Sequence, residues 1–66
     1  MQEKLQKLLE QAYELCEDGN YVMALEYYDI ALDIEPDNLN VMVDNGVTLQ
    51  NLGRFNEALQ MYEKAL

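Results

Sequence analysis

The chain of 66 residues has no histidine, no serine and no tryptophan, and it contains only one threonine, Thr48, and one cysteine, Cys16. Serine and cysteine nucleophiles work with a neighbouring base, which is most often histidine. The catalytic systems that pair serine or cysteine with histidine are therefore excluded.

Basic residues are also scarce, because four Lys and Arg stand against thirteen Asp and Glu and give a net charge of -9. Nucleic acids and anionic membrane surfaces would repel such a chain. No apolar run approaches the roughly 18 residues that span a bilayer, and none resembles the core of a signal peptide. A lone cysteine forms no internal disulfide, which favours a reducing compartment. We therefore expect a soluble, cytoplasmic protein with no nucleic-acid or membrane partner.

Apolar residues make up 50% of the chain and charged residues 26%, which is typical of a folded globular protein. A chain of this length withdraws only about 60% of its unfolded surface from water. We expect residues 1–66 to form a single domain of marginal stability.

The sequence matches itself when it is shifted by 34 residues. Of the 28 pairs that this shift makes from residue 5 onward, eight are identical, whereas chance gives about two. The identical pairs are Leu5 with Leu39, Leu15 with Leu49, Gly19 with Gly53, Ala24 with Ala58, Leu25 with Leu59, Tyr28 with Tyr62, Ala31 with Ala65, and Leu32 with Leu66. One unit is therefore used twice, in residues 5–38 and, six residues short of complete, in residues 39–66.

Each unit carries two apolar stripes at helical spacing. The stripes of the first unit are Leu5, Leu8, Leu9, Ala12 and Leu15, and then Tyr21, Ala24, Leu25, Tyr28, Ala31 and Leu32. Those of the second are Leu39, Met42, Val43, Gly46 and Leu49, and then Phe55, Ala58, Leu59, Tyr62, Ala65 and Leu66. The pattern predicts four helices of about a dozen residues each.

Turn residues separate these helices. Gly19 can take the left-handed conformation that ends the first helix, and Pro36 ends the second because it lacks an amide donor. Asp37 or Asn38 can cap the third helix. The two-residue turns at Gly19-Asn20 and Gly53-Arg54 predict that each pair of helices is antiparallel.

The 34-residue period and the run A-x3-Y-x2-A-x4-P from Ala24 to Pro36 resemble a tetratricopeptide repeat. The resemblance covers residues 5–66, although Gln11 and Asn45 replace the family's leucine in the middle of the first helix. It implies an all-α fold in which two helix-turn-helix units, with four antiparallel helices, stack as a short right-handed α-solenoid.

The resemblance also implies a protein-protein interaction module, because the first helices of such repeats line a concave groove that holds a peptide of the partner. The positions that match the family's groove are Gln6, Leu9, Glu10, Tyr13, Cys16 and Glu17 in the first unit, and Asn40, Val43, Asp44, Val47, Gln50 and Asn51 in the second. Apolar residues flanked by carboxylates suit an apolar or amphipathic peptide that bears basic residues. Packing in the core is the alternative role for Leu9, Tyr13, Val43 and Val47.

One type of ligand known in the family does not fit these groove positions. Chaperone-binding members hold an acidic C-terminal tail with basic side chains and with an asparagine directly after the small residue held here by Ala12 and Gly46. This chain has Tyr13 and Val47 at those positions, and Leu9 where the family has a lysine. An acidic chaperone tail would meet like charge, so we do not expect it as a partner.

Other candidate sites fail on geometry or chemistry. A calcium loop with Gly46 at its sixth position would place valines where oxygen ligands are required. Glu17 and Asp18 are adjacent on a helix and point about 100° apart, unlike a glycosidase pair. Cys16 has no histidine to activate it, which predicts an inert, partly buried thiol. We expect no enzyme activity, no cofactor and no metal.

The C-terminal end of the chain predicts self-association. Tyr62, Ala65 and Leu66 would be uncovered there, and further apolar side chains off the main stripes would add exposed surface: Val22, Met23, Tyr27, Val41 and Met61. Two repeats also fall short of the roughly three that stability requires. We expect a homo-oligomer, formed by stacking of terminal helices or by exchange of a helix between chains. The alternative to a peptide-binding module is thus a self-assembling repeat unit, either a fragment or an engineered piece of a longer array.

Overall fold

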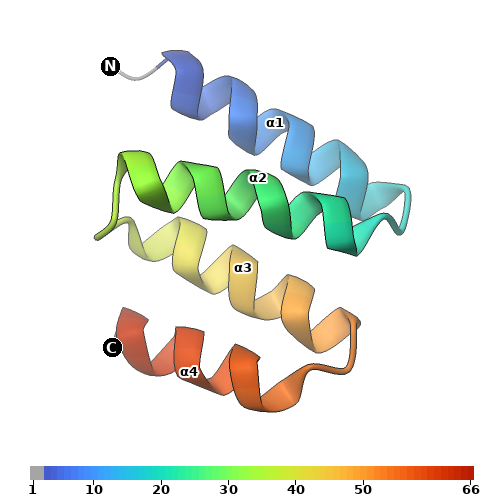
Figure 1. The fold of residues 1–66 in the computed structure, drawn as a ribbon, viewed down its shortest axis with the longest axis vertical. Helices are drawn as coiled ribbons and strands as arrows, with labels where there is room; N and C mark the ends of the chain where they lie inside the picture. The colour runs from blue at the N-terminus through green and yellow to red at the C-terminus, as the bar shows by residue number, and fades with distance from the viewer. Residues whose placement is uncertain (1–2) are drawn as a thin grey trace.

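The computed structural model describes residues 3–66 and contains four α-helices in this part of the chain. Their bounds are Glu3–Glu17 for α1, Tyr21–Ile34 for α2, Leu39–Asn51 for α3 and Phe55–Ala65 for α4. The helices lie side by side in chain order, and each one packs on the next (Figure 1). The predicted all-α fold of two helical hairpins is confirmed.

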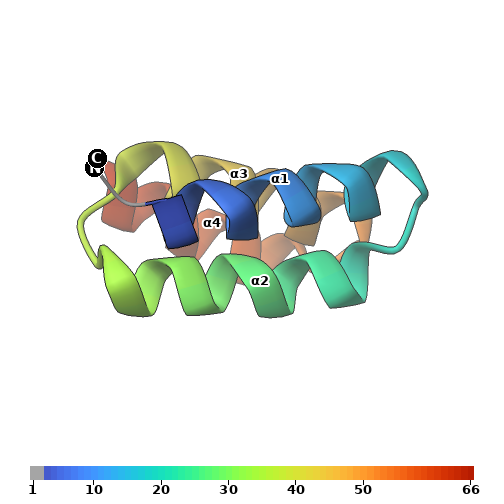
Figure 2. The same cartoon turned by 90° about the horizontal axis from the view of Figure 1, so that it is seen from above.

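The four helices form two layers (Figure 2). Helices α1 and α3 lie on one side of the molecule, and α2 and α4 lie on the other. The Cα atoms extend only 13 Å in the shortest direction, against 32 Å and 28 Å in the other two. One layer of side chains between the two helix layers therefore makes up the core.

The two turns within the hairpins have the same geometry. Gly19 has φ 76° and Gly53 has φ 78°, the left-handed conformation that glycine adopts at a helix C-terminus. The amide of the next residue then closes each turn, since Asn20 N donates to Leu15 O at 2.7 Å and Arg54 N donates to Leu49 O at 2.9 Å. The prediction for Gly19 is confirmed, and Gly53 repeats it.

The loop between the hairpins contains Pro36 and ends at a cap. Asn38 Oδ1 accepts a hydrogen bond from Val41 N at 3.1 Å, and Asn38 Nδ2 donates to Glu35 Oε1 at 2.9 Å. Of the two residues that the sequence offered as the cap of the third helix, Asn38 makes the capping bond.

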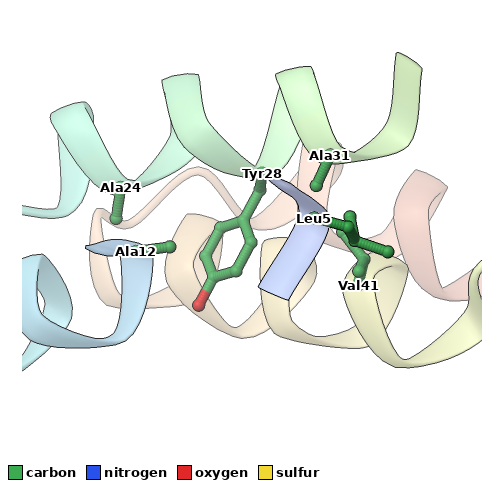
Figure 3. Close-up of a cluster of buried hydrophobic side chains, with 6 residues drawn as sticks. All are labelled: Leu5, Ala12, Ala24, Tyr28, Ala31 and Val41. Atoms are coloured by element: carbon green, nitrogen blue, oxygen red, sulfur yellow. The ribbon is translucent and has the colours of Figure 1, made fainter. Parts of the chain in front are cut away.

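Small residues allow the helices to approach closely around one large side chain. Ala12 and Ala24 are completely buried where α1 faces α2, and Tyr28 of α2 points from its helix toward the layer of α1 and α3 (Figure 3). Leu5 and Val41 complete this cluster farther along. This cluster thus combines residues of three helices, and a second one brings in Ala58 of α4.

Polar groups join α1, α2 and α3 beside this cluster. Cys16 Sγ lies 3.5 Å from Thr48 Oγ1 and 3.9 Å from Tyr28 Oη, and Thr48 Oγ1 donates to Asp44 O at 2.8 Å. Cys16 is half-buried, as predicted. Burial, together with the nearby Cys16, raises the pKa of the Tyr28 hydroxyl well above its usual value near 10.

Val41 was expected to add exposed apolar surface, and this prediction is wrong. Its side chain is fully buried, because α3 packs on α2 and Leu5 of α1 belongs to the same cluster. Val22 and Met23 are exposed as expected, whereas Tyr27 and Met61 are half-buried.

Tyr62 was expected to be bare, but it is half-buried. Gly46 has no side chain, and its backbone lies directly beside the Tyr62 ring, such that a Cβ at Gly46 would stand 2.5 Å from Tyr62 Cε1. The Tyr62 hydroxyl donates to Gln50 Oε1. The aromatic ring therefore ties α4 to α3.

Leu59 lies on a predicted core stripe, yet 56% of its surface is exposed, whereas its equivalent Leu25 is 9% exposed. Helix α3 covers Leu25, and in residues 3–66 no helix packs on the corresponding face of α4. Ala65 is half-buried and Leu66 is fully exposed.

Within residues 3–66, no helix combines the length and the apolar character that crossing a bilayer requires.

Replacing Gly46 with alanine should destabilise the fold by about 1 kcal/mol. Alanine favours the helix by about 1 kcal/mol, but overpacking against Tyr62 costs about 2 kcal/mol. In a Tyr62→Ala background the same change should stabilise the protein by about 1 kcal/mol. Urea unfolding of the four proteins, followed by circular dichroism, measures this coupling. Equal effects of Gly46→Ala in both backgrounds would contradict the contact.

Replacing Tyr28 with phenylalanine should reduce the loss of stability at alkaline pH. Because the pKa of Tyr28 is raised in the folded state, its contribution is complete below pH 10 and is lost as the unfolded chain ionises above that pH. At pH 11 this contribution to the free energy of unfolding falls by about 1.4 kcal/mol. The Tyr28→Phe variant, which has no hydroxyl to ionise, should not show this decrease. Urea unfolding at pH 8 and pH 11 tests the difference, and parallel curves for the two proteins would refute it.

Candidate partner-binding face

The predicted groove residues of both repeats lie on α1 and α3, which form one layer of the molecule (Figure 2). Three apolar side chains of this set are substantially exposed, with 46% for Tyr13, 42% for Val43 and 46% for Val47. Leu9 is half-buried and packs against the core cluster. We call this surface the α1–α3 face, and its apolar part consists of Tyr13, Val43 and Val47.

A hydrogen bond joins the two repeats on this face. Tyr13 Oη donates to Asp44 Oδ2 at 3.0 Å, and the Tyr13 ring lies 6.4 Å from the Tyr28 ring at an interplanar angle of 59°. Partial burial raises the pKa of the Tyr13 hydroxyl, and the hydrogen bond and the charge of Asp44 raise it further. The hydroxyl therefore stays protonated at neutral pH and holds the ring in place.

The other predicted groove residues surround these positions. Those that are exposed are Gln6, Glu10 and Glu17 on α1, and Asn40, Gln50 and Asn51 on α3. Cys16 differs from them, because its sulfur lies against Tyr28 and Thr48. The face thus carries carboxylates and amides around its apolar part.

A second feature lies on the opposite layer and was not predicted. A hollow of about 330 Å3 opens between α2 and α4. Leu25 and Leu49 contribute apolar surface to it, and charged side chains of both signs surround them. Arg54 makes two hydrogen bonds of 2.7 Å to Glu57 there, which lower the pKa of Glu57. Arg54 directly precedes α4, and its spacing of three residues from Glu57 is the only sequence signal for this ion pair.

A hydrogen bond between buried Asn45 and exposed Asp29 borders this hollow. Asn45 is 2% exposed, and its Nδ2 donates to Asp29 Oδ1 at 3.3 Å across the contact between α3 and α2. Asn45 replaces a leucine of the family. Its buried amide group has a hydrogen-bond acceptor in the carboxylate of Asp29. The polar residue is thus part of the contact between the repeats.

In residues 3–66, no three cysteine, aspartate or glutamate side chains come together as a metal site. The α1–α3 face presents apolar side chains and carboxylates, which are groups that can contact a binding partner.

Comparison with known proteins agrees with this architecture. A family model described as tetratricopeptide repeat matches residues 15–66. Protein CTR9 homolog of Arabidopsis thaliana is 40% identical to this chain over 48 residues, which are 73% of this chain and 4% of that protein. The chain therefore spans only a small part of the length of that relative. The match over most of the chain, together with the two helical hairpins, shows that this protein belongs to the tetratricopeptide repeat family.

Proposed function

We propose that the α1–α3 face binds a peptide of a partner protein that presents apolar side chains together with Lys or Arg. Membership of the tetratricopeptide repeat family makes the chain a protein-protein interaction module. The observation that carries the finer proposal is the exposure of Tyr13, Val43 and Val47 on one face of the molecule.

Burial of these side chains supplies the affinity in this proposal. Each is more than two-fifths exposed although the chain has a small core, and covering apolar surface contributes about 25 cal/mol per Å2. Tyr13 is also held by Asp44 and Tyr28, so that little rotamer freedom is lost when a ligand covers it. A rigid aromatic side chain beside two valines suits an apolar segment.

Charge selects the ligand among apolar segments. Glu10, Glu17 and Asp44 lie among the predicted groove residues, and that set contains no Lys or Arg. A basic peptide gains attraction to these carboxylates, and an acidic peptide meets repulsion. Because the carboxylates are largely in contact with water, the attraction weakens as salt is added.

Fluorescence polarisation with a labelled amphipathic peptide of leucine and lysine tests this function. The double variant Val43→Ala and Val47→Ala should weaken binding roughly tenfold, because each change removes two methylene equivalents from the contact. Ile30→Ala on α2 is the matched control, since Ile30 is 43% exposed and lies on the other layer.

A peptide in which glutamate replaces each lysine separates charge from hydrophobicity in the same assay. It should bind at least tenfold more weakly than the lysine peptide at low salt. Equal binding of the two peptides, or an equal loss for Ile30→Ala and the double valine variant, would refute the proposal.

A further inference from the structure

The outer face of α4, which points away from α3, carries the residues that α2 uses to contact α3. A shift of 34 residues places Leu59 at the position of Leu25 and Glu63 at the position of Asp29. Leu66 likewise stands at the position of Leu32. Leu25 is 9% exposed under α3, whereas Leu59 is 56% and Leu66 is 104% exposed. Helix α4 thus presents a docking stripe for which residues 3–66 supply no partner helix.

The outer face of α1 carries several of the residues that α3 uses to contact α2. The same shift places Leu8 at the position of Met42, Gln11 at that of Asn45 and Leu15 at that of Leu49. A hollow of about 350 Å3 opens on this face, lined by Glu3, Lys4, Lys7, Leu8 and Gln11. Helix α1 therefore resembles α3 on the side where no earlier helix covers it in the described residues.

We propose that the outer face of α4 binds the outer face of α1 of a second copy of this chain, in the arrangement that α2 and α3 have within one chain. Leu59 then packs on Leu15 of the second copy, as Leu25 and Leu49 lie in one cluster within the chain. Glu63 lies beside Gln11 of the second copy, as Asp29 lies beside Asn45. The association surface lies apart from the α1–α3 face.

Charge decides between this head-to-tail contact and a symmetric one. The docking stripe of α4, at positions 56, 59, 63 and 66, includes Glu63 and no cation, whereas α1 brings Lys4 and Lys7 to its outer face. Pairing α4 with α4 would bring two Glu63 carboxylates into one contact, and pairing α1 with α1 would bring the lysines together. The head-to-tail contact instead sets Glu63 of one copy near Lys7 of the other, on a part of α1 that Glu3 also borders.

Differences between α1 and α3 limit the strength of this contact. Lys7 stands at the position of the buried Val41, Glu14 at that of Thr48, and Asp18 at that of Leu52. The methylene stem of a lysine can cover apolar surface while its ammonium group stays in water, so Lys7 can reach toward Glu63 without full burial. The contact is therefore weaker than the one within the chain, reversible, and sensitive to salt.

Charge reversal on the two faces tests the proposal by light scattering over a concentration series up to about 1 mM. The wild-type chain should gain mass with concentration, and Lys7→Glu or Glu63→Lys alone should raise the dissociation constant roughly tenfold. An equimolar mixture of the two variants should recover association, because each then offers a face of opposite charge to the other. Both residues are exposed, and circular dichroism checks that each variant keeps its helices.

A matched pair of variants tests the apolar part of the contact. Leu59→Lys should abolish association, whereas Ile30→Lys should leave it unchanged, because the chain itself has Lys64 at the position equivalent to Ile30. Three outcomes would overturn the proposal. They are a monomer at all concentrations, association that survives Lys7→Glu but not Leu59→Lys, which indicates pairing of α4 with α4, and a mixture of charge variants that stays dissociated.

Discussion

The contact between α2 and α3 is the interaction on which the rest of the structure depends. A helical hairpin of this length has too little apolar surface facing inward to fold alone, and stacked repeats gain their core from the neighbouring unit. Here Val41 of the second repeat is fully buried in a cluster with Tyr28 and Leu5 of the first. The Asn45 to Asp29 bond crosses the same contact. Both the α1–α3 face and the outer face of α4 have their shape because this contact fixes one hairpin on the other.

The sequence repeat made the fold predictable. It did not predict which side chains are exposed, because within residues 3–66 the two end helices of the stack lack a neighbour on one side. The 34-residue shift, Gly19 and Pro36 sufficed to predict four helices and their antiparallel pairing. Burial could not be transferred between repeats in the same way. Leu25 and Leu59 occupy the same position of the unit, yet α3 covers only Leu25. A sequence repeat is symmetric, whereas a short stack has two end helices with a neighbour on one side only.

At the candidate site, too, the sequence predicted where residues lie but not which side chains touch. The resemblance to the repeat family placed the groove positions on the first helix of each unit, and these helices share one layer. It could not show that Tyr13 donates to Asp44, because the two residues are 31 positions apart and belong to different repeats. Nor did it show that Cys16 lies against Tyr28 and Thr48. Such contacts depend on side-chain direction after the repeats have stacked, which periodicity alone does not contain.

The order in which the helices pack also determines how the molecule opens. Helices α2 and α3 each pack extensively on two neighbours, whereas α1 and α4 each pack extensively on one and make fewer contacts with the next helix, such as the bond from Tyr13 to Asp44. Separation of an end helix breaks only one extensive helix-helix contact, so partial unfolding starts at α1 or α4 and reaches α2 and α3 last. The amides of α2 and α3 are accordingly the slowest to exchange with solvent. Partly unfolded molecules therefore keep the junction between the two repeats longest, and a chain that has lost α4 to solvent still retains the Tyr28 cluster from which it can re-form.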